Sequence, residues 1–140
     1  RISAMIDRDL EVPGAEDVTA RHRGAERVVE WEGSTYLLPT VVRCDSPEHP
    51  LANREFLFPY AAVVETPAAS LPAVLGSTLA VTVLTEDASL RRRILASPLL
   101  SRLNFGPLPT WKVSWDQPHE GNLFEHLWAR RALQGLPGAA

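Results

Sequence analysis

A cysteine next to an arginine could act as a nucleophile, and the chain contains one such residue. Cys44 is the only cysteine and directly follows Arg43, whose charge could lower the thiol pKa. Neither a glycine-rich loop nor an expected helix N-terminus surrounds it, and these are the settings that usually activate a thiol. We therefore interpret Cys44 as an ordinary cysteine, with a nucleophile as the alternative. A single cysteine excludes an internal disulfide or a cysteine-rich zinc site, and it fits a reducing cytoplasm.

Two histidines and a glutamate near the end of the chain are the next candidates, as metal ligands. His119 and Glu120 are adjacent, and His126 follows later. The His-Glu-x-x-His pattern that binds zinc places its histidines one helical turn apart, and this spacing is different. We expect a structural or hydrogen-bonding role for these side chains and no metal site.

Basic clusters do not indicate a nucleic-acid partner. The chain has 14 basic and 17 acidic residues, a net charge of −3, whereas nucleic-acid binders usually show a basic excess. Consecutive arginines at 91–93 and 130–131 point in different directions around a helix, so we expect them to be solvated. No apolar run approaches the roughly 18 residues that span a bilayer, and from the first residues we expect no secretory signal. We expect neither nucleic acid nor a membrane as a partner, and we expect a cytoplasmic location.

Two further polar residues lie where a ligand could bind. Asn104, followed by Phe105, ends an expected strand, and ligand sites gather at the carboxyl ends of strands in α/β sheets. The alternative is a buried turn. Glu55 precedes an apolar run and could bind ribose hydroxyls. A surface ion pair, for example with Arg54, is the interpretation that chemistry alone favours.

Hydrophobic spacing predicts the elements that would position these residues. Ile2, Ile6 and Leu10 share one helical face, which predicts a helix over 1–10 that ends at Pro13-Gly14. Further helices are expected at 67–76 (with Thr66 as its cap), 88–96 (capped by Asp87) and 122–134. A loop or weak helix is expected at 15–26, and extended runs are expected at 27–31, 36–42, 61–65, 79–85 and 99–105.

The alternation of strands and short helices predicts an α/β fold with a mostly parallel sheet and flanking helices. With 140 residues, 45% hydrophobic, the chain predicts a single domain or partial domain. Within it we expect a helix and loop lead-in at 1–27, an α/β core at 28–110, and an irregular segment and C-terminal helix at 111–140. The first residue, Arg1, stands inside an expected helix, so we expect a piece cut from a longer protein.

Four segments, in order, resemble motifs of the aldehyde dehydrogenase superfamily, in the C-terminal portion of its catalytic domain. Residues 33–41 (GSTYLLPTV) are similar to the family's G-x-x-(Y/F)-x-x-P-T-(V/L) segment, and residues 55–59 (EFLFP) to E-(I/V)-F-G-P. Residues 79–87 (LAVTVLTED) resemble the G-L-A-A-x-V-F-T-x-D strand and helix start. Leu103-Asn104 stands where the family has its V-N strand end. Phe58 replaces the glycine of the second motif, and the tail at 117–124 (QPHEGNLF) looks like that of a divergent subgroup.

This resemblance implies a cysteine thiolate that attacks an aldehyde, hydride transfer to NAD or NADP, and hydrolysis to a carboxylic acid. In the family, the nucleophile and the cofactor domain precede this region, and Cys44 does not match the nucleophile's motif. By position, Glu55 matches the glutamate that contacts the nicotinamide ribose, and Leu57 of the same motif would bind the cofactor with it. Asn104 and Phe105 would bind substrate. The resemblance thus implies no catalytic residue in this chain, and a homo-oligomeric enzyme that takes a small-molecule aldehyde.

A non-catalytic interaction or assembly module with the same half-fold is the alternative. Tryptophan is enriched at interface hot spots, and Trp111, Trp115 and Trp128 could supply them, although core packing is the interpretation favoured for these side chains. A small stand-alone nucleotide-binding protein is excluded because no phosphate-binding loop is present.

Overall fold

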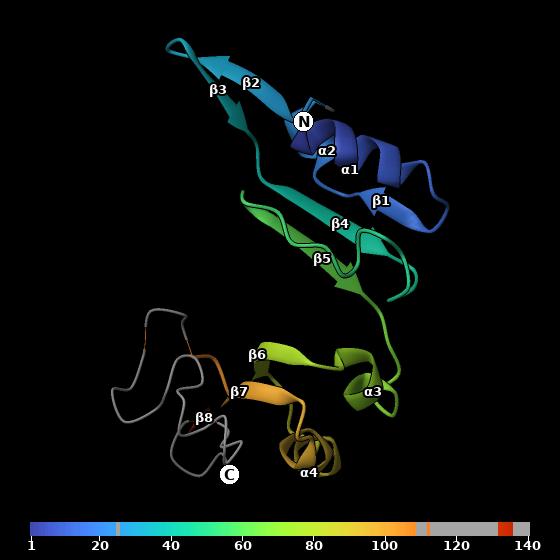
Figure 1. Ribbon diagram of the computed structural model, residues 1–140, viewed down its shortest axis with the longest axis vertical. Coiled ribbons are helices and arrows are strands. Elements are labelled where there is room, and N and C mark those ends of the chain that lie inside the picture. The colour runs from blue at the N-terminus through green and yellow to red at the C-terminus, as the bar shows by residue number, and fades with distance from the viewer. Residues whose placement is uncertain (25, 109–111, 113–131, 136–140) are drawn as a thin grey trace. The chain divides into compact units, whose positions relative to one another are not determined.

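The computed structural model describes residues 1–24, 26–108, 112 and 132–135. The chain forms two compact units, Arg1–Thr66 and Pro67–Ala140, and each is described by itself (Figure 1). The boundary between them falls inside the stretch 28–110 that the sequence assigns to one α/β core.

The first unit combines a three-stranded mixed sheet with a separate hairpin. In the larger sheet, strand β4 lies between β1, which is antiparallel to it, and β5, which is parallel to it. Strands β2 and β3 form a two-stranded sheet of their own within the described part of the chain. The elements in chain order are α1 (Ile2–Leu10), β1 (Ala15–Asp17), α2 (Ala20–Arg23), β2 (Val28–Trp31), β3 (Ser34–Leu37), β4 (Thr40–Cys44) and β5 (Tyr60–Val64).

The turn of the hairpin explains its tight closure. Glu32 and Gly33 join Trp31 to its partner Ser34, and both have positive φ, 49° and 75°. Two central residues with positive φ define the turn type whose twist matches two antiparallel strands. The extended run expected at 36–42 divides at Pro39, which has no N–H to donate to a strand partner.

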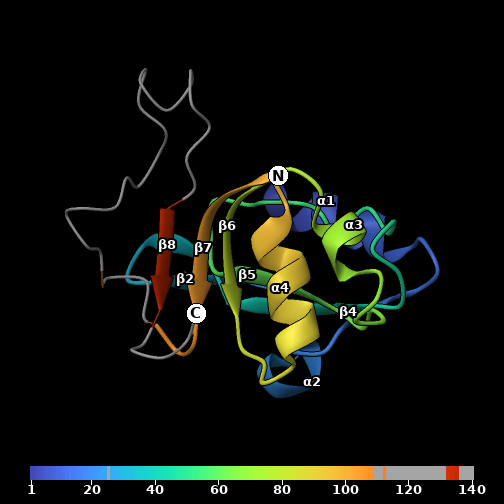
Figure 2. The same cartoon turned by 90° about the horizontal axis from the view of Figure 1, so that it is seen from below.

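The second unit contains a parallel three-stranded sheet in the order β6-β7-β8. Its elements are α3 (Leu71–Leu75), β6 (Thr78–Val83), α4 (Ala88–Ala96), β7 (Leu100–Phe105) and β8 (Ala132–Gly135). Helix α4 lies across β6 and β7 (Figure 2). The helix predicted at 88–96 is confirmed, as is its cap: the Asp87 carboxylate accepts the Ser89 and Leu90 N–H groups at 2.8 and 3.1 Å.

The prediction of an α/β fold with a mostly parallel sheet and flanking helices is wrong. The described residues form three small sheets, and two of the strand pairs, β1–β4 and β2–β3, are antiparallel. A two-residue turn can only join antiparallel strands, since parallel pairing needs a crossover of a dozen or more residues. The polar stretch 15–26, expected to be a loop or weak helix, forms both β1 and α2. The sequence of β1 has no hydrophobic periodicity that would predict a strand; the strand is defined by its pairing with β4.

Two predicted helices also differ from the structure. Helix α3 begins at Leu71, not at 67. Pro72 has no N–H, so a helix that began at 67 could not pair it with the Ala68 carbonyl; the Arg93 guanidinium donates to the Ala68 and Ala69 carbonyls instead. Its N-cap is Ser70, not Thr66. The expected helix at 122–134 is wrong at its end, where residues 132–135 form β8; residues 122–131 lie outside the described part of the chain.

Each unit has its own hydrophobic cluster. In the first, α1, β4 and the following loop contribute Ile6, Val42, Cys44 and Leu51. In the second, α4 and the sheet contribute Val83, Leu90, Ile94, Leu100, Leu103 and Phe105. Among the described residues, no helix is long and apolar enough to cross a membrane.

Candidate functional site

The carboxyl ends of β6 and β7 carry the polar residue that the sequence singles out. Thr82 and Asn104 are register partners on these parallel strands, so their side chains lie on the same face of the sheet. The Asn104 amide donates to the Thr82 hydroxyl at 3.4 Å, a long hydrogen bond. Its buried Oδ1 has no hydrogen-bond partner among the side chains and backbone groups that the structure describes. An amide oxygen accepts hydrogen bonds, and leaving it buried without a donor costs free energy. A ligand or a water that donates to Asn104 Oδ1 would remove this cost.

Phe105 belongs to the core and not to an open surface. It is 4% exposed within the second hydrophobic cluster. The Arg91 guanidinium lies over its ring at 4.9 Å, a cation–π contact between α4 and β7. The sequence predicted a solvated Arg91, but its side chain packs on Phe105 and the residue is half-buried. Phe105 therefore supports the strand end that presents Asn104.

Glu55 and Leu57 lie in the first unit, in the segment that leads into β5. Both are exposed, Leu57 at 95%. The Arg54 side chain, which could have paired with Glu55, approaches the Asp9 carboxylate at 3.4 Å and lies over the Phe56 ring at 6.0 Å. The surface ion pair between Arg54 and Glu55 is thus not formed. Because Asn104 and Phe105 lie in the second unit, the structure groups the four predicted residues two and two.

The segment after Glu55 is a direct neighbour of the segment that contains Pro39. The Thr40 N–H donates to the Pro59 carbonyl at 3.0 Å, and β4 and β5 then run in parallel with Thr40 opposite Tyr60. The two N-terminal motif-like segments, 33–41 and 55–59, therefore meet at the start of two paired strands.

A network of ion pairs around the buried Arg27 contacts Thr40, where the two segments meet. The sequence analysis did not predict this network. Arg27, 5% exposed, donates to Asp7 at 2.8 Å, to Asp17 at 2.9 Å and to the Thr40 hydroxyl at 3.2 Å. Arg23 forms a second ion pair with Asp17. The only available signal was a polar stretch with both charge signs, which is typical of a solvated surface as well.

Hydrogen bonds within this network shift the pKa values of Asp17 and Arg27 so that both charged forms are favoured. Burial alone would raise the pKa of Asp17, but hydrogen bonds from Arg23, Thr19 and Arg27 outweigh it and lower the pKa to about 2. Burial would lower the pKa of Arg27, and the hydrogen bonds to Asp7 and Asp17 raise it instead. The Asp17 carboxylate and the Arg27 guanidinium are therefore both charged at neutral pH, and Arg27 positions the Thr40 hydroxyl by donating to it.

Cys44 lies in an environment that disfavours a nucleophile. It is 1% exposed, and burial followed by the charge of Asp45 raises its pKa. Its Sγ lies 3.8 Å from Nδ1 of His49, but that nitrogen accepts the Leu51 N–H at 3.1 Å. His49 Nε2 faces the Val12 carbonyl at 3.1 Å, which assigns the proton to Nε2. The imidazole is thereby used to fix the loop and has no free lone pair for the thiol.

The other sequence candidates lie outside the described residues: His119, Glu120, His126, Trp111, Trp115, Trp128 and the arginines at 130–131. In the part of the chain that the structure describes, no three His, Cys, Asp or Glu side chains are grouped so as to hold a metal ion. Comparison with known proteins yields no matching family model, no similar curated protein and no similar solved structure.

Proposed function

We propose that this chain is part of an aldehyde dehydrogenase-type oxidoreductase, which oxidises an aldehyde to a carboxylic acid with NAD or NADP. The cysteine that would form the thiohemiacetal, and the cofactor domain, would lie elsewhere in a longer protein. One observation carries the proposal: the Thr40–Pro59 hydrogen bond joins the two N-terminal segments that resemble the family. Thr40 and Pro59, 19 residues apart in sequence, thus meet at the start of two paired strands, as parts of one site must.

The residues present fit one edge of a nicotinamide cofactor. The Glu55 carboxylate is exposed and forms no ion pair among the described residues, so it is available to accept hydrogen bonds from two ribose hydroxyls. The exposed Leu57 offers an apolar contact beside it. When bound, the nicotinamide would supply the hydride acceptor. No phosphate-binding loop is present, so these residues would contact the cofactor and could not hold it alone.

The substrate side of the proposal rests on Asn104. Its unpartnered Oδ1 at the end of β7 can accept a hydrogen bond, and the pair with Thr82 orients the amide. Such a group positions a substrate and performs no bond-making step. The proposal also retains the cytoplasmic location, since Cys44 is a free, buried thiol that suits a reducing compartment.

The test begins with the reading frame upstream of Arg1. The proposal predicts a continuation of roughly 300 residues with a cysteine nucleophile and a dinucleotide-binding unit. The complete protein should then reduce NAD or NADP in the presence of an aldehyde. A start codon within a few residues of Arg1 would contradict the proposal and favour the interaction-module alternative.

A pair of variants of the complete protein separates the role of Glu55 from a general effect of charge. Glu55→Gln should raise the KM for the cofactor about tenfold or more, because it weakens charge-assisted hydrogen bonds to the ribose. The matched control is Glu65→Gln, an exposed glutamate just after β5. Equal KM values in both variants would remove Glu55 from the site.

The 140-residue chain gives a complementary result. Mixed with NAD and an aliphatic aldehyde, it should form no NADH, since the proposal assigns the nucleophile and the cofactor domain to residues outside it. Turnover by this chain alone would refute the assignment of the chemistry to residues outside it.

A further inference from the structure

The outer edge of strand β2 is open, and the proposed enzyme function does not use it. In an antiparallel pair, alternate residues are joined by backbone hydrogen bonds, and the residues between them direct these groups outward. The Leu38 N–H donates to the Arg27 carbonyl at 2.9 Å. The next residue, Val28, therefore directs its N–H and C=O away from β3, and so does Glu30. Within the described part of the chain, no third strand joins this edge and neither backbone forms a hydrogen bond there.

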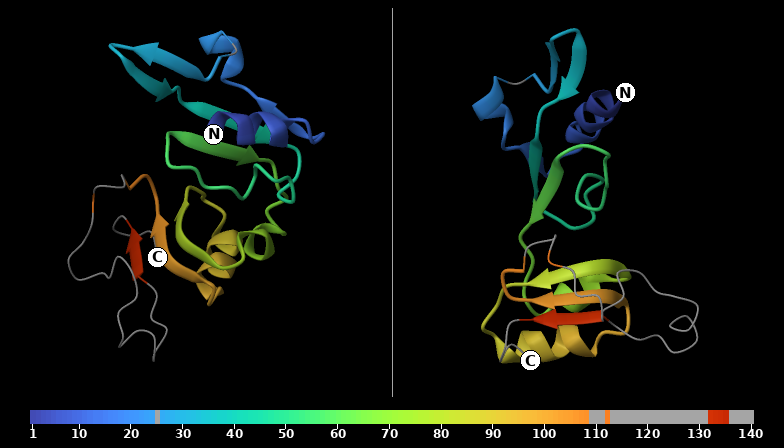
Figure 3. Two further views of the ribbon diagram at one scale, coloured as in Figure 1. Left: turned by 45° about the horizontal axis from the view of Figure 1, so that its top comes forward. Right: turned by 90° about the vertical axis from the view of Figure 1, so that its left-hand side faces the viewer.

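A two-stranded sheet is stabilised by a third strand. An isolated hairpin is marginally stable in water, whereas three strands with an apolar face can be stable. The hairpin lies at one end of the first unit (Figure 3). Its turn, in which Glu32 and Gly33 have positive φ, fixes the register of the two strands. The outward backbone groups of β2 are thus held in line for pairing, which is the arrangement that binds an extended peptide by strand addition.

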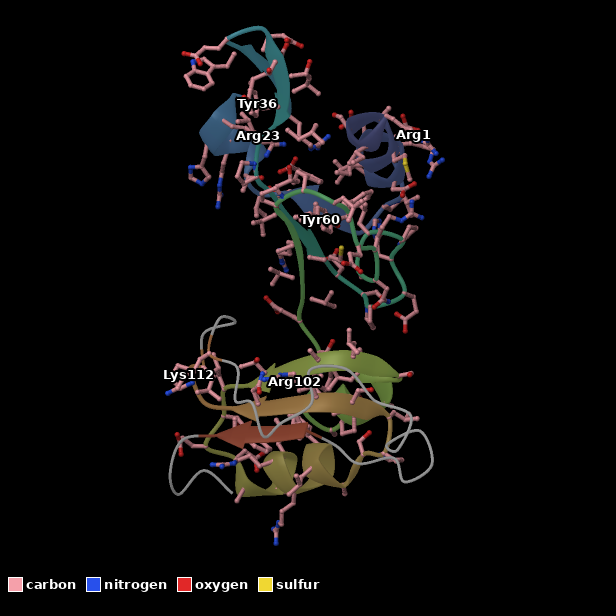
Figure 4. All side chains as sticks on the ribbon, turned by 60° about the vertical axis from the view of Figure 1, so that its left-hand side comes forward. Arg1, Arg23, Tyr36, Tyr60, Arg102 and Lys112 are labelled. Atoms are coloured by element: carbon pink, nitrogen blue, oxygen red, sulfur yellow. The ribbon has the colours of Figure 1, made fainter. Side chains whose placement is uncertain are left out.

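One face of the hairpin offers apolar contacts beside this edge. Side chains alternate between the two faces of a strand, so Val29 and Trp31 of β2 share a face with Tyr36 of β3. Trp31 is 62% and Tyr36 46% exposed, with ring centroids 6.2 Å apart (Figure 4, in which Tyr36 is labelled). An apolar side chain of a third strand would bury surface of both partners beside Trp31.

The opposite face of the hairpin carries negative charge. Glu30 lies there with Thr35, whose hydroxyl donates to one oxygen of the Glu30 carboxylate at 2.5 Å. The second oxygen accepts no hydrogen bond from the residues that the structure describes. Glu26 and Glu32, before and after β2, are exposed as well. The one basic residue between positions 26 and 37, Arg27, is buried in the ion-pair network. Every exposed charge of this stretch is therefore negative.

We propose that the β2 edge binds an extended segment of a partner protein in which basic and apolar residues alternate. The segment adds a third strand: its backbone pairs with Val28 and Glu30, and its apolar side chains lie on the Trp31 face. A lysine or arginine of the segment lies beside the Glu30 carboxylate. Arg21, on α2, is exposed and precedes the hairpin, so we place this basic residue at Glu30, close to the turn. A second hairpin of this chain does not fit, because residues 28–37 include no basic side chain.

The first test measures amide hydrogen exchange of the 140-residue chain mixed with synthetic peptides. The probe is an end-blocked Lys-Val-Lys-Val-Lys-Val peptide. Its controls are Glu-Val-Glu-Val-Glu-Val and Lys-Lys-Lys-Val-Val-Val, which has the composition of the probe without its alternation. At a saturating concentration, the probe should slow the exchange of the Val28 and Glu30 amides at least about tenfold. The amides of Thr35 and Leu37, on the outer edge of β3, should change little.

Two results of this experiment would overturn the proposal. One is an unchanged exchange rate at Val28 and Glu30, or equal effects of the three peptides, since strand addition requires both the pairing and the alternation. The other is protection of these two amides without any peptide that grows with the concentration of the chain, because it would assign the edge to a second copy.

A pair of charge variants tests the contact at Glu30. Glu30→Lys should weaken binding of the probe at least about fivefold and strengthen binding of the acidic peptide, because attraction and repulsion are exchanged. Glu65→Lys, the same change at an exposed glutamate just after β5, should leave both affinities unchanged. Circular dichroism confirms that each variant is folded. Equal affinities of the two variants for the probe would contradict strand addition beside Glu30.

Discussion

The two units of this chain are stabilised at their centres by different interactions. In the first unit, Arg27 and Asp17 are buried together, and Arg23 completes the ion pairs. In the second unit, the centre is apolar, and Leu103 is fully buried between the sheet and α4. A buried ion pair adds little net stability but is costly to break, whereas apolar burial scales with the area removed from water. The first unit therefore adds a few specific polar contacts to its hydrophobic cluster around Ile6 and Val42, whereas the second unit depends on its apolar core.

The comparison predicts its largest effect at Arg27. Arg27→Met removes the donor to Asp17, Asp7 and Thr40 and leaves carboxylate charge without this partner. We expect the free energy of unfolding to fall by about 3–5 kcal/mol. The control is Arg43→Met, because Arg43 and Asp45 form an exposed pair at 3.9 Å, whose loss should cost no more than about 0.5 kcal/mol. Urea denaturation gives both values. Equal losses in the two variants would show that burial of the network does not matter.

In the second unit, the corresponding change is a core truncation. Leu103→Ala leaves a cavity between β7 and α4, and we expect a loss of about 3 kcal/mol. Hydrogen exchange of the β6 and β7 amides measures this loss within the unit itself. Leu84→Ala, at a leucine that is 71% exposed, should change these amides little. If Leu103→Ala were as mild as Leu84→Ala, the second unit would lack the packed core described above.

The pH dependence of stability should separate the two kinds of interaction. The pKa of Asp17 is lowered from 3.8 to about 2 in the folded chain, so the unfolded chain binds more protons between these values. The ionised Asp17 carboxylate therefore stabilises the folded chain above pH 4. This stabilisation, about 1–2 kcal/mol, is lost as the pH falls toward 2. Amide exchange in β1 and β4 at several pH values would measure it. The Asp17→Asn variant lacks this titration, and a loss of the same size in that variant would assign the effect to other carboxyl groups.

The smallest expected effect concerns the cap of α4. The Leu90 and Ser89 N–H groups lower the pKa of Asp87 by donating to its carboxylate. Asp87→Ala should reduce the exchange protection of these two amides by up to about tenfold, while Asp87→Ser should retain most of it because a hydroxyl also caps. A variant with unchanged protection would indicate that packing of Leu90 and Ile94 alone maintains the first turn.

The sequence predicted the elements of the second unit better than those of the first, because the elements around α4 depend more on local interactions. The helix at 88–96, its cap at Asp87 and its flanking strands depend on neighbours within a few residues, so hydrophobic periodicity reveals them. Strand β1 depends on its pairing with β4, where Ala15 meets Cys44, and no local pattern encodes such a partner. The start of α3 follows from Pro72, a local signal, because proline has no N–H to donate to the Ala68 carbonyl.

The candidate site shows the same division. Asn104 could be placed at a strand end from sequence, but its pairing with Thr82 and its unpartnered oxygen come from the register of β6 and β7. The role of Arg27 was not predicted, because one arginine among polar residues resembles any solvated charge. Glu55 was expected on the surface beside Arg54, and the structure directs Arg54 to Asp9 instead.

By itself the sequence determined the identity and order of the motif-like segments, the helix at 88–96 with its cap, and the two strands that flank it. These follow from residue type and local spacing. Only the tertiary structure decided that residues 33–41 and 55–59 meet at Thr40 and Pro59, that His49 holds a loop near Cys44, and that Arg27 is buried with Asp17. The physical reason is that these contacts join groups distant in sequence, and their energy depends on burial and geometry that no single segment contains.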